Sequence, residues 1–327
     1  MGILYLKLVA FFLGIVSNLM FANASKSNKF SVYDPVPGLD PSPYYSVKIK
    51  EKGSEHWTET FMLFTECTEA KHCTWGTGIV KHLANWSNSY LNFEMKDGNS
   101  IELEITMLFG NETISKAVVH PYEASDECVV KDGKAYVTIS HTGLFTVDIN
   151  GQMDDQDTGK LPKTRGGGMV CYLLIKFRMS KTLRIFKGYY DGPPIHTLTI
   201  FANPFIDNKP SLEDPGVHQV HPGEEAPSEG DWHTLYFLPG IHDLGLSFPV
   251  HKNKTYYIPG DALLYATLNN GMVNSDGENI YIYGHGTISG DKYPHPLEEN
   301  PPAEGWTHSP IFFNGKSFNP IIVFKLV

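Results

Sequence analysis

The chain contains little charge, and its charge is not basic. Charged residues make up 19% of the 327 residues, and Asp plus Glu (36) outnumber Lys plus Arg (26), which gives a formal net charge of −10. Proteins that bind nucleic acids use a surplus of Lys and Arg to neutralise phosphates. The missing surplus excludes a nucleic-acid partner, while a mildly acidic surface identifies no other partner by itself.

A sustained helical period is also missing. Apolar and polar residues alternate instead along Ile101–Met107, Val137–Ser140 and Phe145–Ile149, with turn residues such as Asp97-Gly98 and Asn150-Gly151 between such runs. Alternation of this kind is typical of antiparallel strands with one buried face. The sequence therefore predicts an all-β protein.

Several motifs that carry chemistry are absent. The chain has no glycine-rich phosphate loop followed by Lys and Ser or Thr, no Gly-x-Ser-x-Gly nucleophile elbow and no cluster with metal-ligand spacing. We therefore expect neither a cofactor nor a metal site.

Long apolar runs are confined to the N-terminus. Lys7 precedes the apolar run Leu8–Val16, and Ala22-Asn-Ala24 offers a cleavage site of small residues. This order predicts a secretory signal peptide over residues 1–24. A membrane anchor is the alternative, but the run is short and ends at Ser17 and Asn18. We expect a secreted, extracellular protein without membrane attachment after cleavage.

Cysteine is scarce, and export changes how it is interpreted. The four residues are Cys67, Cys73, Cys128 and Cys171. Four cysteines allow three pairings, and an oxidising compartment favours disulfides, of which we prefer Cys67–Cys73 and Cys128–Cys171. A zinc site with His72 is the alternative, although the spacing matches no common zinc pattern.

Short N-glycosylation motifs occur throughout the mature chain. They begin at Asn85, Asn111 and Asn253, whereas Asn23-Ala-Ser25 straddles the predicted cleavage site. We expect glycosylation at the first three in a eukaryotic host.

Composition divides the mature chain into three parts. Residues 25–205 carry the many short strands and frequent turns that are typical of a β-sandwich, ending with the strand Leu198–Phe205. Residues 206–231 are rich in Pro, Glu, Gly and His, and this change predicts a linker. Residues 232–327 change to another pattern.

That pattern is a short strand, a glycine corner and a second strand. It occurs in His233–His242, Thr255–Tyr265 and Glu278–Asp291, and a further strand follows at Asn319–Val323. Repetition at roughly twenty-odd residues indicates a solenoid, in which each coil buries its apolar edge against the next. The sequence predicts the first coils of a parallel β-helix over 232–327.

The motifs of these coils resemble a known family. Leu235-Tyr-Phe-Leu-Pro-Gly240, Tyr257-Ile-Pro-Gly-Asp-Ala262 and Ile280–Gly290, with Leu198–Pro204 upstream, resemble glycoside hydrolase family 49, the dextranase and isopullulanase group. The resemblance implies a β-sandwich followed by a right-handed parallel β-helix, and hydrolysis of an α-glucan such as dextran or pullulan.

Glycosidases use two carboxyl groups at the scissile bond. The resemblance implies aspartates on central coils, which match no position here; we expect them beyond Val327, in a chain truncated at its C-terminus. Asp291, Tyr293 and Trp306 are the candidate substrate-binding residues, because they combine a carboxylate with rings that can stack on sugars. The alternatives are a turn residue for Asp291 and a solenoid cap for Trp306.

Gly284-His-Gly286 also resembles a tripeptide of polygalacturonases, but it lies in an early corner and precedes any candidate aspartate. We therefore expect His285 to be structural and its glycines to serve the backbone bend. Two functions stay open: a polysaccharide-acting hydrolase, which requires further coils with aspartates, and a non-catalytic glycan-binding or matrix protein, which does not.

Overall fold

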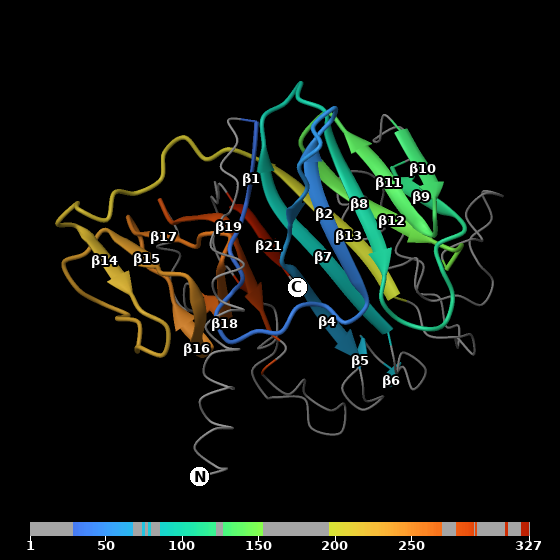
Figure 1. Cartoon of the computed structure of the whole chain (residues 1–327). Coiled ribbons are helices and arrows are strands. Elements are labelled where there is room, and N and C mark those ends of the chain that lie inside the picture. The colour runs from blue at the N-terminus through green and yellow to red at the C-terminus, as the bar shows by residue number, and fades with distance from the viewer. Residues whose placement is uncertain are drawn as a thin grey trace, which may run out of the picture.

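The computed structural model describes residues 29–67, 74–75, 78–79, 86–121, 127–152, 196–269, 279–290, 292, 311–312 and 322–326. These residues form strands and loops, with no helix among them. Figure 1 shows a pair of sheets (blue to green) beside a coil of parallel strands (orange to red). The predicted all-β class, a β-sandwich followed by the beginning of a parallel β-helix, is confirmed.

The first sheet of the sandwich has the order β1-β7-β13-β12-β9, and β4 pairs with β7. Its strands are β1 (Phe30–Val32), β4 (Met62–Cys67), β7 (Trp86–Met95), β9 (Ala117–His120), β12 (Gly143–Ile149) and β13 (His196–Pro204). β7 and β13 pair in parallel along nine positions, from His196 opposite Ser87 to Pro204 opposite Met95. The predicted strand at 198–205 thus lies in the middle of this sheet.

The second sheet is antiparallel, with the order β10-β11-β8-β2-β3. Its strands are β2 (Tyr45–Glu51), β3 (Thr58–Glu59), β8 (Ile101–Met107), β10 (Glu127–Lys131) and β11 (Lys134–Ile139). The predicted alternation is visible in β2, where Tyr45, Val47 and Ile49 are buried and the residues between them are not. These side chains and the inward residues of the first sheet form one core. The short strands β5 (Thr74–Trp75) and β6 (Gly78–Ile79) pair with each other.

The third sheet is parallel throughout and forms the solenoid. Its strands are β14 (Val217–Val220), β15 (Thr234–Phe237), β16 (Gly240–Pro249), β17 (Thr255–Tyr257), β18 (Ala262–Asn269), β19 (Tyr281–Ser289), β20 (Ile311–Phe312) and β21 (Ile322–Leu326). Equivalent residues stack from coil to coil: Leu235 pairs with Tyr256, which pairs with Ile282. All three are buried in the solenoid core, as expected for coils that cover one another's apolar edges.

The bend between two faces of the solenoid lies inside β19. Its first half, Tyr281–Tyr283, pairs with β17, and its second half, from Thr287, pairs with β18. Gly284 lies at the bend with a φ of 128°, and a Cβ there would overlap the carbonyl oxygen of Ile258 in the coil below. The prediction that the glycines of Gly284-His-Gly286 serve backbone geometry is confirmed.

The linker prediction for residues 206–231 is wrong in part. β14 lies within that range and pairs with β15 as the outermost strand of the solenoid. Val220 and Ala226 are buried in the solenoid core, and Trp232 packs beside them. Composition concealed the strand, because β14 has the sequence Val-His-Gln-Val and only one of its residues is fully buried.

The predicted disulfide between Cys128 and Cys171 is not formed. Cys128 is a free cysteine on β10, and its thiol donates to the carbonyl of Ala117 at 3.5 Å. Burial raises the pKa of this thiol. Cys73 and Cys171, and the side chain of Cys67, lie outside the described residues, so the Cys67–Cys73 pairing stays a prediction.

Two of the predicted glycosylation sites are described. Asn111 and Asn253 are both exposed, and Asn253 accepts a hydrogen bond from the Asn279 amide at 3.0 Å. Asn85 lies outside the described residues, as do residues 1–24 of the predicted signal peptide. Among the residues that the structure describes, no helix is long and apolar enough to cross a bilayer.

Candidate functional site

The predicted substrate-binding residues Asp291, Tyr293 and Trp306 all lie outside the described part of the chain. Their neighbour Lys292 is described: its ammonium pairs with Asp243 and lies 5.9 Å from the ring centroid of Tyr265. The role of Asp291, Tyr293 and Trp306 in substrate binding stays a prediction. The described residues instead place a dense polar cluster where the sandwich meets the solenoid.

His285 is the centre of this cluster. Its side chain is 1% exposed, and its Nδ1 lies 2.7 Å from the Tyr33 hydroxyl and 3.2 Å from Glu94 Oε1. Tyr33 follows β1 and Glu94 lies on β7, so two sandwich strands contact the bend of β19. We call Tyr33, Asn92, Glu94, Lys209 and His285 the junction cluster.

The amides of two asparagines extend the cluster into the sandwich. The Asn92 side-chain amide donates to the His285 carbonyl, and the Asn203 amide donates to Asn92 Oδ1 at 2.6 Å. Asn92 lies on β7 and Asn203 on the adjacent β13, where Asn203 is opposite Glu94. The bend of the solenoid is therefore bonded through both its side chain and its main chain.

Electrostatics keep Glu94 ionised although its side chain is 3% exposed. Burial alone favours the neutral acid, but the hydrogen bond from His285, the positive charge of Lys209 and the hydrogen bond from Tyr33 outweigh it and lower the pKa of Glu94. The Lys209 ammonium lies 3.6 Å from Glu94 Oε1. Burial and the same carboxylate raise the pKa of Tyr33, so this phenol acts as a hydrogen-bond donor.

A ladder of tyrosines covers the outer face of the adjoining coils. Tyr236, Tyr257 and Tyr283 stack on successive strands, with ring centroids 4.8 Å and then 5.1 Å apart. The Tyr283 hydroxyl donates to the Asn208 carbonyl at 2.9 Å, in the segment that joins β13 to β14. Tyr257 is 2% exposed, so the middle of the ladder is closed to solvent.

Asp261 lies beside this ladder, and its pKa is shifted in the opposite direction to the pKa of Glu94. Burial, and then the negative charge of Asp34, raise the pKa of Asp261, while a hydrogen bond from its own backbone amide and the positive charge of Lys209 oppose them. Asp261 Oδ1 is buried and has no hydrogen-bond partner among the described residues. Two carboxyl groups with pKa values moved in opposite directions are the arrangement that acid–base catalysis uses.

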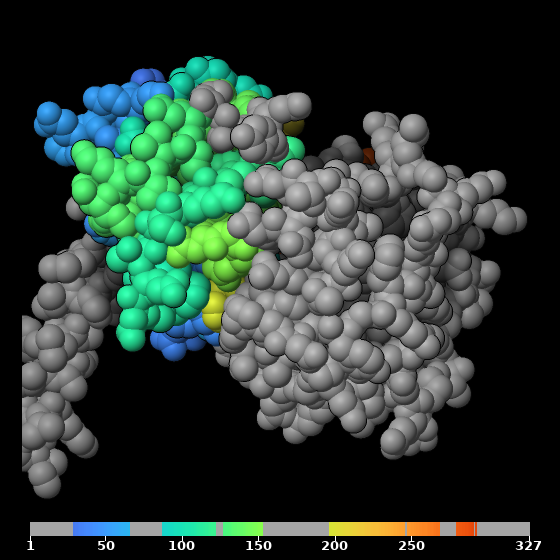
Figure 2. All heavy atoms as spheres, turned by 90° about the vertical axis from the view of Figure 1, so that its right-hand side faces the viewer, coloured from blue at the N-terminus to red at the C-terminus, as the bar shows by residue number. Residues whose placement is uncertain are grey.

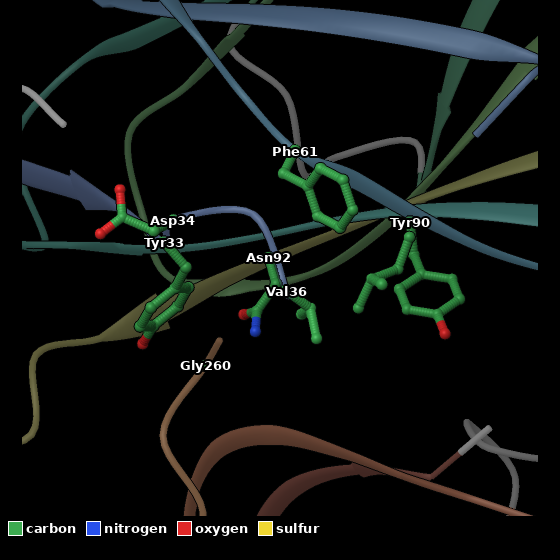
Figure 3. Close-up of a pocket in the computed structure, with 8 residues that line it drawn as sticks. Tyr33, Asp34, Val36, Phe61, Tyr90, Asn92 and Gly260 are labelled. Carbon is green, nitrogen blue, oxygen red and sulfur yellow. The ribbon is translucent and has the colours of Figure 1, made fainter. Parts of the chain in front are cut away.

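The space at the junction is too small for such chemistry on a sugar. A narrow crevice is lined by Tyr33, Asp34, Val36, Phe61, Leu63, Tyr90, Asn92 and Gly260. Figure 3 shows Tyr33, Asn92 and Val36 directed from the sandwich side toward Gly260 of the solenoid. The crevice has room for about one water molecule. In this arrangement the cluster binds the two parts of the chain together.

An apolar contact surrounds the polar cluster. Leu63, Tyr90 and Phe201 of the first sheet pack against Leu263 of β18, with Ile241 and Tyr265 beside them. Burial on this scale stabilises the junction by roughly 1.5–3 kcal/mol for each large side chain that is fully buried. The sandwich and the first coils are thus packed through a core of their own.

Metal binding has no support in the described residues, since no group of three or more His, Cys, Asp or Glu side chains there is placed to hold an ion.

The sequence alone could not reveal the junction cluster. Tyr33 and His285 are separated by 252 positions, and neither Tyr33 nor Glu94 lies in a motif. Only the fold brings them together, through the end of β1, the neighbouring strand β7 and the bend of β19.

Comparisons with known proteins support the fold. No protein-family model matches the chain, and no curated protein matches it. The solved structure of Dex49A from Penicillium minioluteum is similar with a TM-score of 0.55 and 17% sequence identity, over 82% of this chain and 51% of that chain. This chain therefore spans about half the length of Dex49A, with which it shares the fold.

Proposed function

We propose that this protein is a secreted, polysaccharide-acting glycoside hydrolase-like protein whose substrate is an α-glucan of the dextran or pullulan type. The observation that supports it is the order of the fold: a β-sandwich packed on the first coils of a parallel solenoid, shared with Dex49A over 82% of the chain. The resemblance of the coil motifs to glycoside hydrolase family 49 comes from different information and supports the same proposal.

The catalytic groups of this proposal are aspartates on coils other than those described. The described carboxylates of the junction are closed to a substrate, because Glu94 is 3% exposed and the crevice beside it holds about one water molecule. The sandwich then serves as the base on which the first coils are built, and Asp291, Tyr293 and Trp306 stay candidates for sugar contacts.

The test assays the purified protein on dextran and pullulan. We expect release of reducing sugar, and loss of that activity when aspartates of the solenoid outside the described residues are changed to Asn. A protein that binds these glucans without cleaving them supports the second candidate, a glycan-binding matrix protein. A protein that neither cleaves nor binds any α-glucan contradicts both.

A further inference from the structure

The outer face of the second sheet carries two aromatic side chains that the junction does not use. Trp57, directly before β3, and Tyr136, on β11, have ring centroids 6.4 Å apart with an angle of 51° between their planes. Both are partly exposed. The sandwich core does not include them, whereas Ala135 and Val137, the sequence neighbours of Tyr136, belong to it.

Strand register explains why the two rings meet. Tyr136 is opposite Glu104 on β8, and Glu104 is opposite Lys48 on β2. Along the next row, Lys50 of β2 is opposite Glu102 of β8. Trp57 lies over this second row, because the β2–β3 pairing places Thr58 opposite Ile49.

The Trp57 ring packs against the ammonium group of Lys50. The Lys50 ammonium lies 4.4 Å from the centroid of the Trp57 ring and 3.5 Å from Glu102 Oε1. A cation over the face of an indole is favourable by about 0.5–1 kcal/mol at exposed sites. Lys50 thus occupies one face of the Trp57 ring. Among the described aromatic rings, Trp57 contacts Tyr136 alone.

The charges around the rings cancel in pairs. Lys48 pairs with Glu59 at 2.7 Å, Lys50 with Glu102 at 3.5 Å, and Lys134 with Glu104 at 2.8 Å. The Tyr136 hydroxyl donates to Glu104 Oε2 at 3.0 Å. Lys52 pairs likewise with Glu127 at 3.1 Å, so the charges of these four pairs cancel, and the groups around the rings offer hydrogen bonds without a strong field of one sign.

From this arrangement we propose that Trp57 and Tyr136, with the paired Lys and Glu side chains around them, bind a neutral polysaccharide chain. A sugar ring has an apolar C–H face, which stacks on an aromatic ring, and a rim of hydroxyls, which takes hydrogen bonds from carboxylates and ammonium groups. The balanced charge favours this neutral ligand over a phosphorylated or acidic polymer. Figure 2 shows residues of β2–β3 (blue) and β10–β11 (green) at the surface of the molecule.

The proposed platform is separate from the solenoid. It lies on the sheet β10-β11-β8-β2-β3, whereas the solenoid packs on the other sheet of the sandwich, through Tyr90 of β7 and Phe201 of β13. A polysaccharide bound at this platform would stay attached to the sandwich while other parts of the same polysaccharide lie on the solenoid. This goes beyond the proposed hydrolase activity, and it holds equally for a protein that binds glycan without cleaving it.

The test is binding to dextran and pullulan by the complete protein, measured by affinity electrophoresis and by titration calorimetry. We expect Trp57→Ala and Tyr136→Ala each to weaken binding about tenfold, and Trp57→Phe to retain most of it. Leu144→Ala is the matched control, because Leu144 is 37% exposed on β12 of the opposite sheet. Unfolding midpoints of all variants identify any loss that is due to misfolding.

A second readout does not require a folded alanine variant. Dextran should change the tryptophan fluorescence of the parent protein, and Trp57→Phe should remove that change while the protein still binds. Parent-like binding by Trp57→Ala and Tyr136→Ala, or no binding of neutral glucan by the parent, overturns the platform. Hydrolysis that persists in both variants leaves the proposed function intact, so the two failures are distinguishable.

Discussion

Glu94 Oε1 of the sandwich lies 3.2 Å from His285 Nδ1 of the solenoid, although 191 positions separate the two residues in the sequence. Their side chains are 3% and 1% exposed. A buried carboxylate is stable only when hydrogen bonds and opposite charge replace its water. Glu94 obtains them from both parts of the chain, so its ionisation depends on the junction being closed.

Replacing Glu94 with Gln should weaken the junction. The substitution keeps the shape of the side chain but removes the charge that attracts Lys209, so the bonds from His285 and Tyr33 lose their ionised acceptor and meet a neutral amide. We expect the free energy of unfolding to fall by about 1–3 kcal/mol, the usual effect of breaking a buried, charge-assisted hydrogen bond. Urea unfolding followed by far-UV circular dichroism measures it.

Glu59→Gln is the matched control, because Glu59 also pairs with a lysine but its side chain is 58% exposed. An exposed pair contributes about 0–1 kcal/mol. If both variants lose equal stability, the buried position of Glu94 has no special role, and the interpretation of the junction cluster is wrong.

The Glu94 contribution should depend on pH in one direction. Its pKa in the folded protein is lowered from 4.5. A carboxyl group of this kind stabilises the folded state fully above its unfolded-state pKa, and the contribution disappears as the pH falls through the folded-state pKa. The stability difference between the parent protein and Glu94→Gln should be constant near neutral pH and shrink below about pH 4.5. A difference that grows on acidification contradicts this assignment.

Local patterns were enough to predict most of the strands. The alternation along Ile101–Met107 corresponds to β8, and the glycine corner at Gly284 corresponds to the bend of β19. Each of these signals is contained in about ten residues, so the physics that produces it is visible in the sequence. The coils were predicted in the same way, because a glycine corner recurs along the chain, at Gly240, Gly260 and Gly284.

The junction could not be predicted in the same way. Tyr33, Glu94 and His285 become a cluster only through strand order, since β1, β7 and β19 are distant in sequence. β14 was missed for a related reason: its polar side chains follow from its place at the end of the solenoid, where only Val220 is fully buried. Tertiary contacts determine both the junction cluster and β14, and such contacts produce no periodic pattern in the local sequence.

Asp261 should be a destabilising residue at neutral pH. Its folded-state pKa is raised from 3.8, chiefly by burial, and its Oδ1 has no partner among the described residues. The ionised form is therefore disfavoured in the folded state, an effect that is complete above the folded-state pKa and absent below the unfolded-state pKa. We expect Asp261→Asn to raise stability by about 1 kcal/mol at pH 7.

The gain should vanish below about pH 3.8, where Asp261 is protonated in both states. Asp231→Asn removes the same charge from an exposed side chain and controls for the change in net charge. Should Asp261→Asn lower stability at pH 7, the carboxylate has a favourable partner in the folded protein, and the assignment fails.

Gly260 is the position where the closest packing of the junction can be tested. A Cβ added there would overlap the Tyr33 ring, and Tyr33 carries the hydroxyl that bonds to His285. Gly260→Ala should therefore displace the ring and break this hydrogen bond, at a cost of about 1–3 kcal/mol. The unfolding midpoint and proteolysis within residues 205–216 are the measurements, because a loosened junction releases the contacts of Lys209 with Glu94 and of Asn208 with Tyr283 that hold this segment.

Gly290→Ala controls for the intrinsic effect of the added methyl group, since a Cβ at Gly290 would meet nothing within 4 Å. The mechanism itself is tested by a double-mutant cycle. In a Tyr33→Ala background the ring is gone, so Gly260→Ala should then cost less than it does in the parent protein, and the two substitutions should be clearly non-additive. Additive effects would show that Gly260 acts through the backbone of the solenoid corner and not through the ring that packs on it.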